Sequence, residues 1–432
     1  MLCANIAVNG EGRLTFAGQD TTLLARQFGT PLYLLDEDRI RENCRAYTQA
    51  FARLFPAGSK VLYASKANAF RRIYRIVQEE GLGVDVVSGG EIYTAKAAGF
   101  DLKNAYFHGN NKTDDEIRLA MDCGVGTFVV DGKDELSAVA AEAARRGIRQ
   151  RILLRITPGI DPHTYEAVAT GKVDSKFGVA IETGQAAALT KAALALDSVE
   201  LHGFHCHVGS QVFGEDVFER GVAVMVEFMA DMREKLGFTA AALDLGGGFG
   251  VRYDEGDPTL DVEKKLISVA AVLHETCARL GYPAPAFLME PGRAIVADAG
   301  MTLYTVGSVK RITGYKNYVS VDGGMTDNPR FALYGALHTV LPAGKMNEAR
   351  TLRCDVVGKC CESGDVIRPA ADLPDSTVRG DLLAVCTTGA YNYSMASNYN
   401  RVPRPPIVLL SGGKAELAVR RETPEDLIRL DQ

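Results

Sequence analysis

Between about residue 33 and residue 295, short apolar runs rich in β-branched residues alternate with longer segments of helical period. The runs that suit strands are LYLL (32–35), VLYAS (61–65), VDVVS (84–88), AYFHG (105–109), TFVVD (127–131), RILLRI (151–156), LHGFHCHVG (201–209), AALDLG (241–246) and FLMEPG (287–292). A strand followed by a helix and another strand builds a parallel sheet. Eight or nine such units predict a closed (β/α)8 barrel of the TIM type.

Two of the intervening segments carry helix signals of their own. Thr113 and Glu116 have the spacing of a capping box before an apolar run. Ile73, Ile76 and Val77 fall on one helical face before Gly81. We expect a helix at both places.

Polar and glycine-rich residues follow the ends of the predicted strands. The segments are YASKAN, SGGE, HGNNK, HVGSQ, GGGFG and EPGR. In a (β/α)8 barrel these positions gather at one mouth, where catalytic groups lie. The functional residues are therefore expected in these segments.

The pattern changes after about residue 296. Short alternating strands with turn signals take over, as in MTLYTVGSVK, NYVSVDGG, RCDVVGKCC, DLLAVCT and PPIVLL. A barrel needs only roughly 250 residues, so this stretch predicts a second, antiparallel β domain. We predict a barrel domain at 33–295 and a β-sandwich or β-barrel-like domain formed by 1–32 and 296–432.

Charge and hydropathy exclude several kinds of partner. The net charge is −6 and no long run of Lys or Arg occurs, which argues against nucleic acid and anionic membranes. No run approaches the roughly 20 apolar residues of a membrane span, and the N-terminus lacks a signal-peptide pattern. We expect a small-molecule substrate and a cytoplasmic location. The nine cysteines lack metal-ligand spacing, so reduced thiols are expected.

Lys66 stands directly after the apolar run in LYASKAN. A lysine at a barrel mouth that is partly desolvated can form a Schiff base through its amine. An ordinary surface lysine in a loop is the alternative on this motif alone.

His205 and His207 lie two residues apart in HCHVGSQ, so on a strand their side chains would share one face. Such a pair could bind a metal, but no acidic or cysteine ligand at compatible spacing completes the site, and we expect no metal. The remaining alternatives are a core histidine and an imidazole stacked on an aromatic cofactor ring.

LDLGGGFG places Gly246, Gly247, Gly248 and Gly250 after an apolar strand. Glycines at this position let backbone N–H groups surround a phosphate. The spacing differs from a dinucleotide G-x-G-x-x-G, because Tyr253 stands where its last glycine would be. A single phosphate fits better, and a plain glycine-rich turn is the alternative.

Glu290 opens the segment EPGR after the strand FLM. A carboxylate at the barrel mouth can pair with a protonated pyridine nitrogen and keep that ring electron-withdrawing. An ordinary ion pair between Glu290 and Arg293 is the alternative.

Taken together and in order, the motifs closely resemble the diaminopimelate decarboxylase family. They are YASKAN, VSGGE, HGNNK, SKFG, FHCHVGSQ, LDLGGGFG, MEPGR, DNPRFALY, CCESGD and GAYNYSMAS, from about Tyr63 to about Ser397. The family is similar to ornithine decarboxylase and alanine racemase in its barrel and β domain, and it uses pyridoxal phosphate as an obligate homodimer. The resemblance implies a carboxy-lyase that converts meso-2,6-diaminopimelate to L-lysine and CO₂, the last step of lysine biosynthesis.

The resemblance also implies roles for the cofactor-binding residues. Lys66 would form the Schiff base with the cofactor, and His207 would stack on its ring. Glu290, with Pro291 and Gly292 beside it, would meet the pyridinium nitrogen. The residues implied around the phosphate are Ser210, Gly246, Gly247, Gly248, Arg293 and Tyr391.

For the substrate, the resemblance implies a fork of guanidinium groups and an acid at the distal amino-acid centre. Arg293 and Arg330 suit its carboxylate and Glu362 its ammonium, and Tyr334 and Tyr391 are the other implied contacts. In this family the CESGD segment reaches the active site of the other subunit. The resemblance implies that Cys361 protonates the carbon that has lost CO₂, and a thiol suits this role because an ordinary thiol, with a pKa of about 8.5, is mostly protonated at neutral pH.

One departure from the family pattern concerns this cysteine. A proline or similar apolar residue usually precedes it, whereas Lys359 and Cys360 stand here. Either thiol could face the cofactor, and we choose Cys361 because it adjoins Glu362.

Two other functions remain open. An amino-acid racemase on the same fold would need a second base and a pocket for a short side chain, and CCESGD and DNPRFALY favour distal-group recognition instead. A cofactor-binding regulator without catalysis is disfavoured because Lys66, Cys361 and Glu362 are all present. Assays of CO₂ release and of racemisation separate these readings.

Overall fold

The structure is a computed structural model of the 432-residue chain and describes residues 2–160, 175–214 and 216–432. The chain divides into two compact units. We call residues 43–250 and 259–292 the barrel unit, and residues 1–42, 251–258 and 293–432 the β unit.

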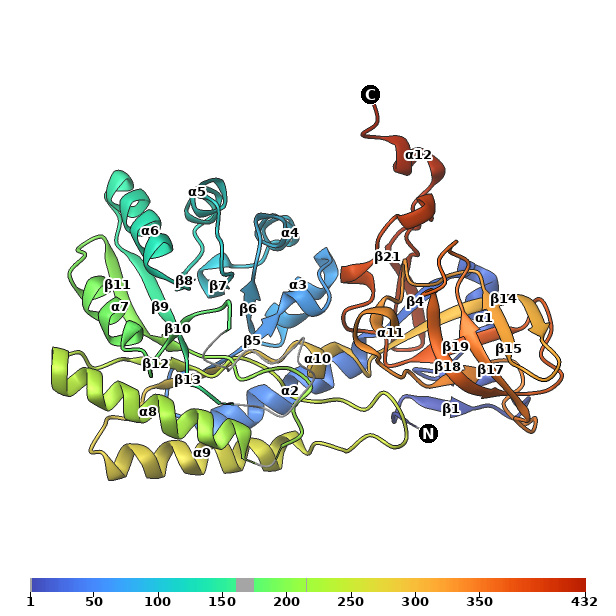
Figure 1. The fold of residues 1–432 in the computed structure, drawn as a ribbon, viewed down its shortest axis with the longest axis horizontal. Coiled ribbons are helices and arrows are strands. Elements are labelled where there is room, and N and C mark those ends of the chain that lie inside the picture. The colour runs from blue at the N-terminus through green and yellow to red at the C-terminus, as the bar shows by residue number, and fades with distance from the viewer. Residues whose placement is uncertain (1, 161–174, 215) are drawn as a thin grey trace. The chain divides into compact units, whose positions relative to one another are not determined.

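The barrel unit contains a closed ring of eight parallel strands (Figure 1). In ring order they are β5 (Lys60–Ala64), β6 (Gly83–Val86), β7 (Ala105–Phe107), β8 (Thr127–Val130), β9 (Gln150–Thr157), β11 (Val199–His205), β12 (Ala242–Asp244) and β13 (Ala286–Met289). Pairing of β13 with β5 and of β8 with β9 closes the ring, and β10 (Val179–Ala180) adds to β9 outside it. The predicted (β/α)8 barrel is confirmed.

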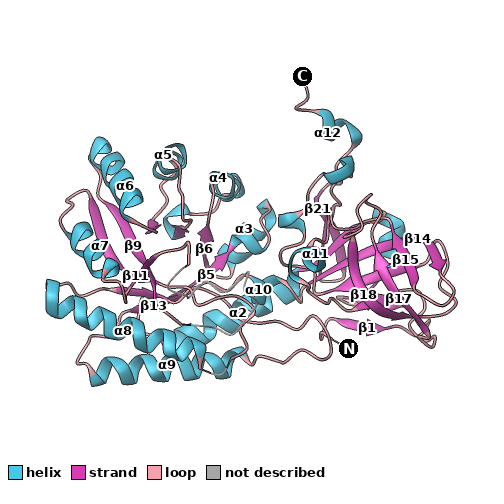
Figure 2. Ribbon diagram, in the orientation of Figure 1, coloured by secondary structure: helices cyan, strands magenta, loops and turns pink. Residues whose placement is uncertain are grey.

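Helices follow the strands of the ring and lie outside it (Figure 2). They are α3 (Arg71–Glu79), α4 (Gly89–Ala98), α5 (Asp114–Asp122), α6 (Lys133–Arg146), α7 (Gln185–Leu194), α8 (Val217–Leu236) and α9 (Val262–Arg279). A further helix, α2 (Glu37–Leu54), contains the boundary between the two units.

The two helix signals in the sequence are confirmed. Helix α5 begins with a complete capping box in which Thr113 and Glu116 each bond the other's backbone N–H. Helix α3 buries Ile73, Ile76 and Val77, and Gly81 follows it with a φ of +80°.

The β unit contains a large sheet and a small one. The large sheet has the order β18-β17-β15-β14-β4-β20-β21, with β19 on β14 and β16 on β19. The bounds are β4 (Leu32–Asp36), β14 (Gly300–Arg311), β15 (Asn317–Val321), β16 (Val340–Pro342), β17 (Leu352–Val357), β18 (Val366–Leu373), β19 (Leu382–Cys386), β20 (Ile407–Ser411) and β21 (Lys414–Val419). The small antiparallel sheet consists of β1 (Ile6–Val8), β2 (Leu14–Phe16) and β3 (Gln19–Asp20).

Helices are short in the β unit. They are α1 (Thr21–Phe28), α10 (Arg293–Val296), α11 (Arg330–Tyr334) and α12 (Pro424–Ile428). Residues of β1, β2 and α1, including Leu14, Phe16 and Leu24, join a buried cluster with Met301 and Val408 of the large sheet. The N-terminal residues therefore share the core of this unit.

The sheet of the β unit is mixed rather than purely antiparallel. Most of its pairs are antiparallel, as predicted, but β15 pairs parallel with β17 and β20 pairs parallel with β4. The connections between these strands are long enough to return the chain in the same direction.

The prediction that LYLL (32–35) forms a barrel strand is wrong. This run lies in β4, which pairs antiparallel with β14 and parallel with β20 in the β unit. All five residues of β4 are buried. A continuous apolar run predicts a strand covered on both faces, and it does not tell which sheet the strand joins.

Within the described ranges, no helix combines the length and the apolar character that a membrane crossing requires.

Candidate active site

Each of the eight ring strands carries a polar or charged residue within its last residues or directly after its end. In ring order these are Lys66, Asp85, His108, Asp131, Arg155, His205, Asp244 and Glu290. The carboxyl ends of parallel ring strands meet at one mouth of a barrel. The barrel unit therefore has one mouth lined with titratable groups.

Lys66 lies in a single 3-10 turn, Ser65–Ala67, that directly follows β5. Its Nζ is 3.7 Å from Oδ2 of Asp85, and the two side chains are 44% and 1% exposed. Burial raises the pKa of Asp85 against the lowering effects of His108 and Lys66. The amine thus lies at the surface of the mouth above a buried carboxyl group.

Glu290 follows β13 and lies between two imidazoles. Its Oε1 is 2.7 Å from Nε2 of His108, and its Oε2 is 3.5 Å from Nε2 of His205. Burial acts to raise the pKa of Glu290, but His108 and His205 outweigh it and hold that pKa well below its usual range. Glu290 is therefore an ionised carboxylate in a buried site.

Asp244 lies beside Glu290 and behaves oppositely. Burial, reinforced by the charge of Glu290, raises the pKa of Asp244 well above its usual range. Its Oδ1 accepts a hydrogen bond from the backbone N–H of Gly246 at 2.9 Å. The pKa values of the two acids therefore shift in opposite directions, which favours the negative charge on Glu290 over Asp244.

The structure corrects one step in the argument about His205 and His207. Strand β11 ends at His205, so His207 lies beyond the strand. The fold brings Asp244, Glu290 and His108 to His205, with ligand atoms within 4.8 Å of one another. Acidic groups do therefore complete a cluster with His205, although their separation in the sequence hid this. These donors could suit a divalent cation, and the ionised Glu290 equally suits a protonated pyridine nitrogen.

The glycines after β12 are required by close backbone contacts. Gly246 and Gly248 have φ values of +70° and +120°. A Cβ atom would lie 2.5 Å from Nδ1 of His207 at Gly246, 2.2 Å from the Glu290 carbonyl at Gly247 and 2.4 Å from the Gly209 carbonyl at Gly248. The glycine loop is therefore packed directly against the His207 ring and two backbone carbonyls, and a larger residue at any of the three positions would clash.

The loop that carries His207 and Ser210 is bonded to this glycine loop. The N–H of Val212 donates to the Gly248 carbonyl at 2.9 Å, and the N–H of Gly250 donates to the Val212 carbonyl at 3.1 Å. Burial and the charge of Lys66 hold the pKa of His207 well below its usual value. The neutral His207 ring thus lies against the glycine loop, and Ser210 belongs to the loop that is bonded to it.

A second group of candidate residues lies in the β unit and centres on Tyr391. Arg293, the first residue of α10, donates to the hydroxyl of Tyr253, and its guanidinium carbon is 4.7 Å from the Tyr391 ring. Arg330, the first residue of α11, is 5.4 Å from the same ring and 4.4 Å from the ring of Tyr334. Two guanidinium groups therefore share one aromatic neighbour.

Arg330 is buried without a compensating charge. It is 6% exposed, and no ion pair joins it to a carboxylate of the described residues. Burial lowers the pKa of Arg330, and the neighbouring Arg293 lowers it further. A buried cation without an acidic partner favours an incoming anion, and guanidinium binds carboxylate and phosphate through paired hydrogen bonds.

Cys360 and Cys361 differ in their surroundings. Both lie between β17 and β18. Burial and the nearby Asp365 raise the pKa of the half-buried Cys360 thiol to about 11. Cys361 and Glu362 are exposed.

Comparison with known proteins identifies the family. Residues 37–297 match the family described as pyridoxal-dependent decarboxylase, pyridoxal binding domain. The diaminopimelate decarboxylase of Halalkalibacterium halodurans is 46% identical, with 98% of this chain and 96% of the relative covered. The chain belongs to the diaminopimelate decarboxylase family. It is a carboxy-lyase that uses pyridoxal phosphate.

Other relatives support the same assignment. The enzyme from Bacillus subtilis is 44% identical over 98% of this chain and 96% of its own length. The crystal structure of the diaminopimelate decarboxylase from M. jannaschii in co-complex with L-lysine has a TM-score of 0.91 and 35% identity, covering 99% of this chain and 98% of that one. For this decarboxylase, the ionised Glu290 suits the protonated pyridine nitrogen of the cofactor.

The structure adds residues that the sequence analysis missed. Asp85, His108, Arg155 and Asp244 all lie at the barrel mouth, although none was predicted as a site residue. A signal was present in the sequence, because each is a charged or imidazole group within or directly after an apolar strand. The predicted site residues form three groups: the barrel mouth, the cluster around Tyr391, and the exposed segment of Cys361 and Glu362.

Proposed function

We propose that Lys66, Glu290, Arg330 and Cys361 carry the main steps in the decarboxylation of meso-2,6-diaminopimelate to L-lysine and CO₂. This reaction is the last step of lysine biosynthesis. The observation that carries the assignment is the amine of Lys66 at the mouth of a barrel whose strand ends supply a buried, ionised Glu290 and a closely packed glycine loop.

The barrel unit would hold the cofactor. Lys66 binds it covalently, and His207 offers a neutral ring for stacking. Gly246, Gly247 and Gly248 with Ser210 would surround the phosphate, and Glu290, preceding Pro291 and Gly292, would accept the proton of the pyridine nitrogen. When bound, pyridoxal phosphate supplies a ring that accepts the electron pair released with CO₂.

Arg293 and Tyr391 would serve the phosphate or the substrate. The guanidinium of Arg293 already has a hydrogen bond to Tyr253, so its orientation is fixed before any ligand arrives. A fixed donor loses little conformational entropy on binding.

The distal centre of the substrate carries a carboxylate and an ammonium group. Arg330 would bind the carboxylate, because its buried guanidinium has aromatic neighbours and no acid in the described part of the chain. Glu362 would bind the ammonium, and Tyr334 would line the contact. Holding this end fixes the orientation of the reacting end.

The bond between the α-carbon and its carboxylate then breaks and CO₂ leaves. Cys361 would deliver its S–H proton to that carbon, and the resulting thiolate takes a proton from solvent. The exposure of Cys361 supports this role, because an exposed thiol can approach a substrate. The half-buried Cys360 cannot approach one as readily.

We also propose that the enzyme acts as a homodimer in which Cys361 and Glu362 of each chain serve the site of the partner. The support is the resemblance of the CCESGD segment to the family, together with the exposure of both side chains. A cytoplasmic location is proposed as well, and all nine cysteines being free supports it.

The test is a side-by-side measurement of CO₂ release from meso-diaminopimelate, L-ornithine, L-arginine and L-lysine, with a parallel assay for racemisation. We expect CO₂ release from meso-diaminopimelate to exceed the others by orders of magnitude. Equal or faster release from L-ornithine would contradict the proposed roles of Arg330 and Glu362. Racemisation without CO₂ release would contradict the reaction.

A further inference from the structure

The backbone of Cys361 is held by a residue far away in the sequence. Its N–H donates to Oδ1 of Asn400 at 2.8 Å. Cys361 lies in a segment without helix or strand, and its side chain is exposed. Because no helix or strand ladder holds this segment, the hydrogen bond contributes directly to the placement of Cys361.

Asn400 adopts a backbone conformation that costs free energy. Its φ is +53°, and the φ of Arg401 is +54°. Residues other than glycine rarely adopt this left-handed conformation, although asparagine does so more readily than most. Two such residues in succession persist only where surrounding contacts enforce them, and strained residues concentrate at functional sites.

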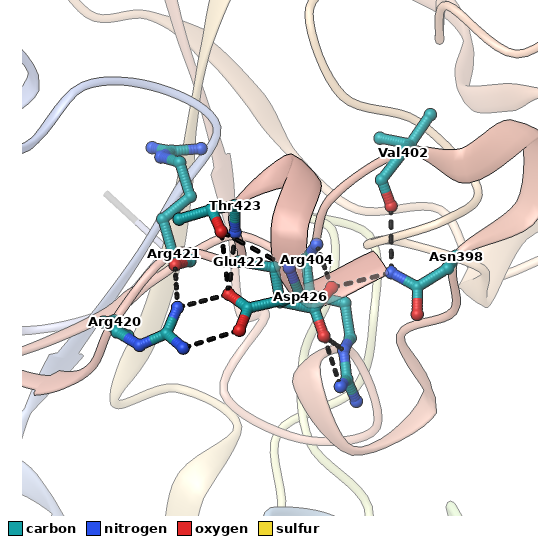
Figure 3. Close-up of polar contacts among 8 residues, drawn as sticks. All are labelled: Asn398, Val402, Arg404, Arg420, Arg421, Glu422, Thr423 and Asp426. Atoms are coloured by element: carbon teal, nitrogen blue, oxygen red, sulfur yellow. Dashed lines mark hydrogen bonds and ion pairs between the residues drawn. The ribbon is translucent and has the colours of Figure 1, made fainter. Parts of the chain in front are cut away.

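The contacts that hold this turn come from the C-terminal segment. The Asn398 amide donates to the Val402 carbonyl at 3.1 Å and to Glu422 at 2.7 Å, and Glu422 also accepts from Nε of Arg404 at 2.7 Å (Figure 3). Glu422 therefore fixes both ends of the 398–404 turn.

Arg401 adds a second attachment to the same segment. It donates to the Leu427 carbonyl at 2.6 Å and to Asp431 at 3.0 Å. Residues 422–431 thus lock the turn in which Asn400 sits.

The other end of the cysteine segment is fixed independently by Asp365. This carboxylate accepts from the N–H of Cys360 at 2.8 Å and from the N–H of Met325 at 2.6 Å. The Asp365 carboxylate also packs closely against the backbone of Gly358, because a Cβ atom at Gly358 would lie 2.2 Å from an Asp365 oxygen. Asp365 anchors Cys360, and Asn400 supplies the next contact, at Cys361.

We propose that Asn400 is a positioning residue for decarboxylation, which orients the thiol of Cys361 through its backbone N–H. The strained turn places the Asn400 amide, and the C-terminal segment maintains the turn. This inference rests on the proposed function of Cys361 as the proton donor.

The experiment compares Asn400→Gly, Asn400→Asp and Asn317→Ala in the holoenzyme. Glycine keeps the left-handed backbone and removes the acceptor, whereas aspartate keeps an acceptor oxygen. Asn317 is the matched control, since it is a half-buried asparagine of the same unit whose amide donates to the Arg353 carbonyl. For Asn400→Gly we expect kcat to fall roughly tenfold with KM within about twofold, because the contact matters after the substrate is bound.

Two further results are expected. Asn400→Asp should restore most of kcat, and Asn317→Ala should match the unmodified enzyme. By mass spectrometry, the peptide containing Cys361 should exchange its amide hydrogens faster in Asn400→Gly than in the control. Unchanged kcat in Asn400→Gly, or an equal loss in Asn400→Asp, would overturn the proposal.

A double variant separates this proposal from the role of Cys361 itself. If Asn400 acts only through Cys361, adding Asn400→Gly to Cys361→Ala should cause no further loss. Full activity of Cys361→Ala would refute the proton-donor role, whatever Asn400 does. If Cys361→Ala loses activity while Asn400→Gly keeps the kcat of the unmodified enzyme, only the positioning role of Asn400 would be refuted.

Discussion

The Nε2 atom of His108 lies 2.7 Å from Oε1 of Glu290, and both side chains are 5% exposed. Strands β7 and β13, which end directly before these residues, are not neighbours in the ring. The contact therefore crosses the barrel interior. It places a ring nitrogen next to the carboxylate that is proposed to meet the cofactor.

Replacing His108 with alanine should weaken the binding of pyridoxal phosphate. Without the imidazole, burial would raise the pKa of Glu290, and the protonated acid could no longer attract a pyridinium. A hydrogen bond to a charged group contributes about 1.5–3 kcal/mol, which corresponds to a tenfold to hundredfold weaker affinity. Titration of the apoenzyme with pyridoxal phosphate measures this change in affinity. His274→Ala, which removes an exposed imidazole of the same unit, should leave the titration unchanged.

Lys66→Ala should remove covalent attachment of the cofactor. We expect the purified variant to lack the visible absorbance of bound pyridoxal phosphate, to yield no borohydride-trapped adduct, and to lose nearly all turnover. Lys60→Ala is the control, because Lys60 is an exposed lysine at the start of the same strand. Near-normal turnover of the Lys66 variant would remove this residue from the mechanism.

Much of the fold could be predicted because the relevant signals are local. The runs from VLYAS to FLMEPG each form a ring strand. They could be predicted because they alternate with helices and end in polar residues, and both features are typical of a (β/α)8 barrel. LYLL carries the same local signal, but it joins the sheet of the β unit. The signal could not separate the two sheets, because strands buried on both faces occur in both of them.

The contacts within the site could not be predicted from local patterns. The position of Asp85 and Arg155 near strand ends is visible in the sequence, but their partners, Lys66 and Asp131, come from neighbouring strands and become apparent only when the ring closes. Asn400 and Cys361 are 39 positions apart, and neither a period nor a motif connects them. Their contact depends on two left-handed residues held by the C-terminal segment, and such strain is visible only in the fold.

Glu91 should make stability depend on pH. Burial raises the pKa of this carboxyl from 4.5 to about 7, although the N–H of Val87 donates to it at 2.7 Å and opposes the rise. Between these values the unfolded chain releases the proton while the folded protein keeps it. The stabilising contribution is therefore complete below about pH 4 and is lost as the pH rises to about 7.

The measurement is urea unfolding of the enzyme and of Glu91→Gln at pH 4 and pH 8. At 1.36 kcal/mol for each unit of pKa difference, the variant should gain at most about 3 kcal/mol relative to the unmodified enzyme on going from the lower to the higher pH. Glu227→Gln, which alters an exposed carboxylate, should show no such gain. A constant difference between Glu91→Gln and the unmodified enzyme would contradict the expected titration.

Arg330→Ala should lower kcat/KM for meso-diaminopimelate strongly. Removing the buried guanidinium leaves the distal carboxylate of the substrate without its partner, which costs on the order of 2 to 5 kcal/mol by analogy with a broken buried charge pair. Arg311→Ala is the control, because Arg311 forms an exposed ion pair with Asp375. Equal kcat/KM values for the two variants would exclude Arg330 from the substrate site.

Mixing two inactive chains should restore activity if sites are shared between subunits. Lys66→Ala lacks the cofactor lysine and Cys361→Ala lacks the proposed proton donor, so each homodimer has two defective sites. In a heterodimer, one site combines Lys66 of one chain with Cys361 of the other and is intact. At equal amounts half of the dimers are mixed and each has one working site, so about a quarter of normal activity should return.

Mixing Lys66→Ala with the double variant lacking both groups is the control, because no pairing then supplies an intact site. If activity stayed absent after subunit exchange had been verified by mass spectrometry, Lys66 and Cys361 would have to serve the same chain.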